Sequence, residues 1–311
     1  MLPLTKIQNG MKQVLIIGFP GDNTIYHILN IATMGNYPFR FLNLKAYYEN
    51  GYIESANTTD PEVVYNFERF CLKDFSGIYQ RLSPPLPEKY DSINYMRAMS
   101  RYKALHYVLL ATKLKIINPI NAGWDNASKP FQTYLLMKHG FKIPTSMSTS
   151  IPSDFEQFNN KFISIYKSNS STRSIVDVTQ PQDSSRKETL INAPVFFQQY
   201  ISGKDVRIHI FNDKAFAVEI KSDAIDYRYY KKKGTYSNMK AIDNTEAPKL
   251  LINLCISYAK ERRIVLAGFD FKVTETNEWH CLEMNPMPGY DSYDRVLGNA
   301  ISIDILNHLL S

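Results

Sequence analysis

The stretch VLAGFDFKVTETNEWHCLEMNPMPGY, Val265 to Tyr290, contains the pattern that decides the fold. Two apolar runs, VLAGFDFKV and EWHCLEMN, flank a short polar segment, which is typical of two neighbouring strands joined by a hairpin loop. With Thr276 and Asn277 at the tip, symmetric antiparallel pairing predicts that Glu275 lies opposite Glu278. The same register then continues down both strands and decides which side chains share a face.

Three oxygen-bearing side chains converge in this register. Asp270 is predicted to lie opposite Glu283, and Asn285 shares the face of Glu283 because strand side chains alternate. Two facing carboxylates repel each other without a cation, and carboxylate and amide oxygens are ligands that Mg²⁺ takes when phosphate oxygens complete its shell. We therefore predict that Asp270, Glu283 and Asn285 bind Mg²⁺, with Mn²⁺ as an alternative metal. The other interpretation is a polar hairpin whose three residues are only exposed.

Composition indicates an ordinary globular protein. The 311 residues are 44% hydrophobic and 21% charged, which suits two or three packed subdomains. The net charge of +6 favours anionic ligands without specifying nucleic acid. Three cysteines far apart and without metal spacing predict reduced thiols, and the apolar run Val14 to Phe19 is too short for a membrane span. We predict a cytoplasmic protein with no membrane partner.

The order of elements predicts the fold class. A strand at 12–18, a helix at 23–34 and a strand at 39–44 form a small α/β beginning of doubly wound type. Later strands, a helix near 246–262, the hairpin and a last helix at 299–310 predict an α+β arrangement around an antiparallel sheet. We place the domain boundaries at 1–118, 119–192 and 193–311.

A polar loop follows the predicted strand Lys161 to Lys167. The loop Ser168 to Arg173 is rich in hydroxyls and backbone amides, and includes Ser170. A lysine at the end of a strand, facing such a loop, suits binding of a triphosphate, with Arg173 adding charge. The alternative is a solvated hairpin tip, a common use of serine-rich loops.

Taken in order, these segments resemble the ATP-grasp superfamily, and within it the RimK-like carboxylate–amine ligases and the microviridin-type macrocyclase ligases. The matching motifs are Ser128-Lys129 before a helix, Lys167, FFQQYI at 196–201, DVR at 205–207, DYR at 226–228, AGFDF at 267–271 and EMNPMPG at 283–289. They cover the chain from about Asn118 to its end. The resemblance implies two α+β subdomains that clasp ATP, preceded by a small α/β domain.

The resemblance also implies roles for individual residues. Lys129 and Lys167 match lysines on the nucleotide phosphates, and Asp205 falls in the nucleotide site with its motif. The hinge strand beside the adenine would comprise Gln198, Gln199, Tyr200 and Ile201, reading the base through backbone groups. Arg207 and Arg228 match cationic positions near the γ-phosphate or an acyl phosphate; an ion pair with Asp205 or Asp226 is the structural alternative. Arg81 is similar to a front-domain arginine of the macrocyclase-type ligases.

The function that this resemblance implies is an ATP- and Mg-dependent ligation of a carboxylate to an amine through an acyl phosphate, with release of ADP and phosphate. Its substrates would be small-molecule or peptide carboxylates and amines. A kinase on the same scaffold is the first alternative. A nucleic-acid-binding protein that uses the basic, tyrosine-rich segment 228–233 is the last. The sequence leaves open whether the protein forms a homo-oligomer.

Overall fold

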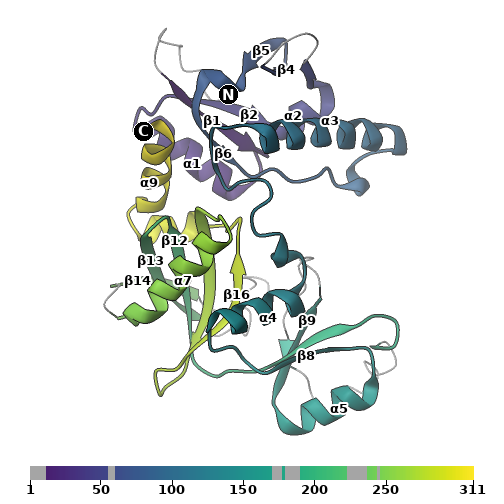
Figure 1. Cartoon of the computed structure of the whole chain (residues 1–311), viewed down its shortest axis with the longest axis vertical. Helices are drawn as coiled ribbons and strands as arrows, with labels where there is room; N and C mark the ends of the chain where they lie inside the picture. The colour runs from purple at the N-terminus through teal and green to yellow at the C-terminus, as the bar shows by residue number, and fades with distance from the viewer. Residues whose placement is uncertain (1–11, 55–59, 170–176, 179–189, 223–236, 244–245) are drawn as a thin grey trace. The chain divides into compact units, whose positions relative to one another are not determined.

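The computed structural model describes residues 12–54, 60–169, 177–178, 190–222, 237–243 and 246–311 (Figure 1). The chain divides into two compact units. One comprises Met1–Ala122 together with Gly289–Ser311, and the other comprises Gly123–Pro288.

The first unit is built on a parallel sheet of four strands in the order β2-β1-β6-β7, beside a small antiparallel sheet β3-β4-β5. Residues Val14 to Ile17 of the central strand β1 are fully buried, as expected where helices cover both faces of a parallel sheet. The strands are β1 (Gln13–Gly18), β2 (Phe39–Asn43), β3 (Tyr52–Glu54), β4 (Glu62–Tyr65), β5 (Glu68–Cys71), β6 (Phe75–Gln80) and β7 (Lys115–Ile117). The helices are α1 (Asn23–Met34), α2 (Leu44–Asn50), α3 (Ser92–Ala111), α8 (Asp291–Val296) and α9 (Ala300–Leu310), with short 3-10 turns at η1 (Leu72–Asp74) and η2 (Pro87–Lys89).

The C-terminal helix α9 belongs to this first unit, unlike the expected division, which joined it to residues 193–311. Its apolar face, with Ile301, Ile305 and Leu309 fully buried, packs against β6 and β1. A Cβ at Gly77 of β6 would lie 2.7 Å from the Leu309 side chain. The parallel sheet therefore gains a covering helix from the far end of the chain, because the apolar faces of both elements leave water together.

The second unit contains two antiparallel sheets, in the orders β10-β9-β11-β8 and β14-β13-β12-β15-β16 (Figure 1). Their strands are β8 (Ser146–Thr149), β9 (Ser164–Ser168), β10 (Asp177–Val178), β11 (Val195–Gln199), β12 (Lys204–Phe211), β13 (Lys214–Ser222), β14 (Ser237–Ile242), β15 (Leu266–Val273) and β16 (Trp279–Asn285). The helices are η3 (Trp124–Ala127), α4 (Lys129–His139), α5 (Pro152–Lys161) and α7 (Lys249–Glu261). The strand predicted from Lys161 begins instead at Ser164, because α5 continues to Lys161.

The predicted hairpin forms between β15 and β16, but its turn lies elsewhere. Thr274 donates to the carbonyl of Glu278, and Asn277 takes a positive φ of 58°, so Glu275 does not face Glu278. The pairs nearest the turn, from Val273 with Trp279 to Phe271 with Cys281, are therefore shifted by one residue from the prediction. A bulge at Leu282 shifts the register back, and Asp270 lies opposite Glu283 as predicted.

Side chains alternate between the two faces of the five-stranded sheet. On one face, Phe269 and Phe271 are buried, and Phe269 contacts the ring of Tyr258 in α7. The opposite face carries a row of polar side chains from β12, β15 and β16. The sheet thus packs one face into the core and carries polar side chains on the other.

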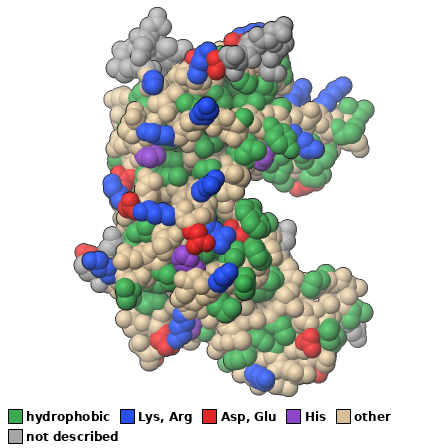
Figure 2. Space-filling model, viewed as in Figure 1, with side chains coloured by type: hydrophobic (Ala, Val, Ile, Leu, Met, Phe, Trp, Pro, Cys, Tyr) green, Lys and Arg blue, Asp and Glu red, His purple; other side chains and the backbone are tan. Residues whose placement is uncertain are grey.

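Charged side chains on the visible face of the molecule are scattered. Figure 2 shows Lys and Arg there among hydrophobic and acidic side chains, with no continuous basic stripe among the described residues of that face. The segment 228–233, on which the nucleic-acid alternative depends, lies outside the described residues. Within the described ranges, no helix has the length and apolarity that crossing a membrane requires.

Candidate active site

Asp270 and Glu283 lie opposite each other on β15 and β16, on the polar face of the five-stranded sheet. Asn285 follows on the same face, and its Nδ2 donates to Glu283 Oε1 at 3.2 Å. Between them, Met284 is fully buried and points to the other face. The hairpin therefore brings together the two carboxylates and the amide that the sequence predicts as metal ligands.

Two cations lie beside these carboxylates. Arg207 Nη1 is 2.6 Å from Asp270 Oδ2, and Lys129 Nζ is 3.9 Å from Glu283 Oε2. These side chains are 6% to 20% exposed, so the charges lie in a partly desolvated site where mutual attraction is stronger than in water. The positive groups offset the repulsion expected between facing carboxylates.

Arg207 is held on three sides. It is the cross-strand neighbour of Asp270, which explains why an ion pair forms between these two residues. Its Nε lies 3.4 Å from Nε2 of His209. Burial, and then the charge of Arg207, hold the pKa of His209 well below its ordinary value, so the neutral ring accepts this hydrogen bond. A Cβ at Gly268 would lie 2.7 Å from Arg207 Nη2, so the guanidinium packs closely on that glycine.

The two predicted phosphate lysines lie on neighbouring elements. Lys129 is the first residue of α4, and its backbone N–H donates to the carbonyl of Asn169 at 2.9 Å. Asn169 follows the end of β9, two residues beyond Lys167. Lys167 is buried, and its Nζ donates to Oε1 of Gln198 at 3.1 Å. The start of α4 and the end of β9 are thereby joined.

The predicted hinge lies at the end of β11. Gln198 is 1% exposed, whereas Gln199 and Tyr200 are half-buried and Ile201 is buried. The backbone N–H of Gln199 donates to Thr145, and that of Tyr200 donates to Ile163. The amides of these two hinge residues are therefore engaged within the protein.

Asp205 lies at the other end of the polar row, opposite Lys272. Its Oδ2 is 2.8 Å from Lys272 Nζ, and both side chains are 12% to 13% exposed. Asp205 thus lies two residues from Arg207 on the same face of β12, and it pairs with Lys272 instead of Asp270. The remaining predicted residues, Ser170, Arg173 and Arg228, lie outside the described part of the chain.

The donor set fits a hard divalent cation. Two carboxylates and an amide oxygen are the ligand types that Mg²⁺ prefers, and a nucleotide would supply the rest of its shell. No group of three or more His, Cys, Asp or Glu side chains with metal-ligand spacing occurs among the described residues. The candidate metal site therefore depends on Asp270, Glu283 and Asn285 alone.

Sequence reasoning missed three residues that shape this site: His209, Gly268 and Gln132. The alternation of DVRIHI places His209 on the face of Arg207, and that signal was available. Gly268 contacts the guanidinium of Arg207, and the Gln132 side chain bonds to the backbone of Met284. Both contacts join separate elements, for which a single sequence carries no local signal.

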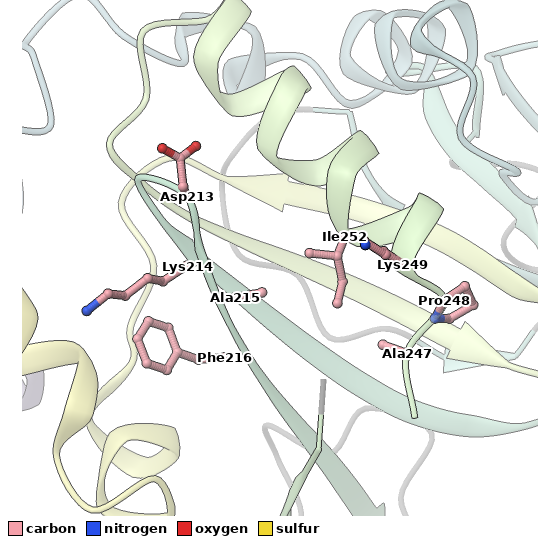
Figure 3. Close-up of a pocket in the computed structure, with 8 residues that line it drawn as sticks. All are labelled: Asp213, Lys214, Ala215, Phe216, Ala247, Pro248, Lys249 and Ile252. Atoms are coloured by element: carbon pink, nitrogen blue, oxygen red, sulfur yellow. The ribbon is translucent and has the colours of Figure 1, made fainter. Parts of the chain in front are cut away.

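A hollow of about 750 Å³ lies elsewhere in the second unit (Figure 3). It is formed by the β12–β13 turn and the beginning of α7, with Phe216 and Ile252 among its lining and Lys214 and Lys249 beside them. No described residue of the predicted site lines it. This hollow is therefore separate from the candidate site, which rests on the polar row of the sheet.

Comparison with solved structures supports the fold. The chain resembles the ATP-grasp ligase PsnB complexed with a phosphomimetic variant of its minimal precursor, Mg and ADP, with a TM-score of 0.80, 20% identity and coverage of 96% of this chain and 98% of that one. It resembles the macrocyclase MdnC of Microcystis aeruginosa bound to the precursor peptide MdnA, with a TM-score of 0.79, 19% identity and coverage of 96% and 99%. It also resembles D-alanine–D-alanine ligase of Bacillus anthracis complexed with ATP, with a TM-score of 0.60, 15% identity and coverage of 96% of each chain.

A search by sequence among curated proteins gave no match. The predicted ATP-grasp fold is confirmed by the structural likenesses above. Residues 127–309, more than half of the chain, match the RimK-like ATP-grasp domain. Because this match covers more than half of the chain and the fold agrees with it, this protein is a member of the RimK-like ATP-grasp family.

Proposed function

We propose that this protein joins a carboxylate to an amine in an ATP- and Mg-dependent reaction that passes through an acyl phosphate and releases ADP and phosphate. The observation that carries the proposal is the facing pair Asp270 and Glu283, with Asn285 beside them and cationic Arg207 and Lys129 at the carboxylates. Such a site neutralises and positions phosphates, which phosphoryl transfer requires above all.

In this proposal Asp270, Glu283 and Asn285 hold Mg²⁺, which when bound spreads and neutralises the charge of the nucleotide phosphates. Lys129 and Lys167 bind phosphate oxygens. Arg207, held against Asp270, stabilises the charge that develops as the substrate carboxylate attacks the γ-phosphate, and Arg228 is assigned a similar role from its motif.

The mechanism needs no covalent nucleophile from the protein. Burial raises the pKa of the Cys255 and Cys281 thiols well above their ordinary value, which disfavours a thiolate at either position. The amine instead attacks the acyl phosphate, the new C–N bond forms as the C–O bond to phosphate breaks, and the amine releases a proton.

Peptides are the substrates we favour. PsnB and MdnC have been solved with precursor peptides, and a ligase of Chryseobacterium gregarium with a leader and core peptide. Structural similarity at about 20% sequence identity supports the fold alone. That this protein also acts on peptides is our proposal. The first peptides to supply should carry an acidic side chain as the carboxylate. The amine should come from a peptide side chain or an N-terminus.

The test is ADP release from ATP in the presence of peptide and amino-acid pools, with mass spectrometry of the products. The proposal expects release only when a carboxylate and an amine are both present, and a product lighter than its components by one water. A stable phosphoester would favour the kinase alternative. Asp270→Asn and Glu283→Gln should abolish Mg-dependent turnover while circular dichroism stays unchanged; full turnover in both variants would exclude the metal assignment.

A further inference from the structure

Gln132 links α4 to the edge strand β16 through its side-chain amide. It lies one turn after Lys129 and is 3% exposed. Its Nε2 donates to the carbonyl of Met284 at 2.8 Å, and the Met284 N–H donates to its Oε1 at 3.1 Å. The side-chain amide thus makes the two hydrogen bonds that a neighbouring strand would make at this residue. Nε2 also lies 3.3 Å from Oδ1 of Asn126.

The position of Met284 gives this link its importance. Met284 separates Glu283 from Asn285, so holding its N–H and carbonyl holds the two flanking residues at a set distance from α4. Residues three apart on a helix are neighbours on its surface, so Lys129 and Gln132 approach β16 together. Lys129 Nζ reaches to 3.9 Å from Glu283 Oε2.

We propose that Gln132 is a positioning residue, which fixes Lys129 and the pair Glu283 and Asn285 in one arrangement for nucleotide and metal. The inference rests on the proposed function. Gln132 does not touch the reacting atoms in this account. Its backbone hydrogen bonds act through the two elements that carry the site.

The test compares Gln132→Met with a matched control, Gln80→Met in the first unit. Gln80 is 7% exposed and makes the same pair of bonds to backbone, to the carbonyl of Asn118 at 2.8 Å and from the N–H of Leu82 at 2.7 Å. Both substitutions remove a buried amide that pairs with one backbone N–H and one backbone carbonyl, and Gln132→Met also removes the bond to Asn126. Gln132→Met should therefore lower the melting temperature at least as much as Gln80→Met does.

Calorimetry with ADP, in EDTA and then in MgCl₂, separates positioning from stability. For the wild type, Mg²⁺ should tighten ADP binding. Gln132→Met should reduce that Mg-dependent gain on the order of tenfold, the usual loss when a residue that orients metal ligands is removed. Gln80→Met should leave the gain within about twofold of the wild type, because Gln80 bonds to the backbone of Asn118 and Leu82 and not to the strand that carries Glu283 and Asn285.

An equal Mg-dependent gain in Gln132→Met and Gln80→Met, with ADP bound by the wild type, would overturn the inference and leave the proposed function standing. If the wild type bound no ADP in either buffer, the proposed function would fail and the inference with it. Should Gln132→Met not fold, Gln132→Glu takes its place, because its carboxylate still accepts from the Met284 N–H. That variant is expected to lose part of the gain, and an unchanged gain would count against the inference.

Discussion

Replacing Gly268 with alanine should disturb the site far more than it disturbs the fold. The new Cβ would lie 2.7 Å from Arg207 Nη2 and 2.9 Å from its Cζ and Nε. The φ of Gly268 is not in the left-handed region, so the backbone accepts alanine without strain. The guanidinium must therefore move, by about 0.7 Å, to reach the 3.4 Å of an ordinary contact.

The cost to stability can be worked from the ion pair. Lengthening the 2.6 Å separation of Arg207 and Asp270 by that amount loses about 1.4 kcal/mol at an effective dielectric constant of about 20. A gain of roughly 0.4–1 kcal/mol from the lower entropy of the unfolded chain opposes this loss. The melting temperature should thus fall by no more than about 4 °C.

The cost to turnover should be larger, because a displacement approaching 1 Å at a positioned group costs on the order of 100-fold in rate. Steady-state ADP release and thermal unfolding, each measured for Gly268→Ala and for Gly21→Ala, provide the check. Gly21 has open space where its Cβ would be, so Gly21→Ala should change neither quantity. Wild-type turnover in Gly268→Ala would refute the idea that the guanidinium must be held in place.

Three further predictions concern other buried groups. Lys167→Met should weaken ADP binding in calorimetry by roughly tenfold, since a charged phosphate contact is lost while Gln198 remains; an unchanged Kd would remove Lys167 from the phosphate site. The pKa of His209 is lowered well below 6.5 in the folded protein, so below about pH 6.5 the unfolded chain binds one proton more than the folded chain. The free energy of unfolding therefore falls as the pH is lowered below about 6.5. In His209→Phe this slope in urea titrations should flatten, and an identical slope would contradict the assignment. Asp294 is fully buried and accepts hydrogen bonds from Ile301, Ser302 and His27. Asp294→Ala should therefore lower the free energy of unfolding, measured in urea titrations, by about 3 kcal/mol or more. A loss under about 1 kcal/mol would show that those donors find other partners.

Local rules in the sequence accounted for much of the fold. Asp91 caps α3 by accepting from the N–H of Asn94, and α4 ends at Gly140 with a φ of 104°, and both are residue types that favour these positions. Alternation correctly put Glu283 and Asn285 on one face. These features depend only on residues close in the chain, which is why a single sequence specifies them.

The register of the hairpin shows where local rules end. A turn one residue away from the prediction and a bulge at Leu282 cancel, so Asp270 faces Glu283 although the inner pairs were wrong. Bulges respond to packing on both faces of a sheet, which the hairpin sequence does not contain. The predicted facing of the two carboxylates was thus right through compensation.

By itself, the sequence determined the residue types of the candidate site, the alternation that aligns them and the ordered motifs of the family. The tertiary structure decided the partners: Arg207 with Asp270, Lys129 with Glu283, and Gln132 with Met284. It also assigned α9 to the first unit. These pairings join residues up to 154 positions apart, as between Lys129 and Glu283. Their geometry follows from how sheets and helices bury their apolar faces together, a property of the whole packed chain and not of any segment.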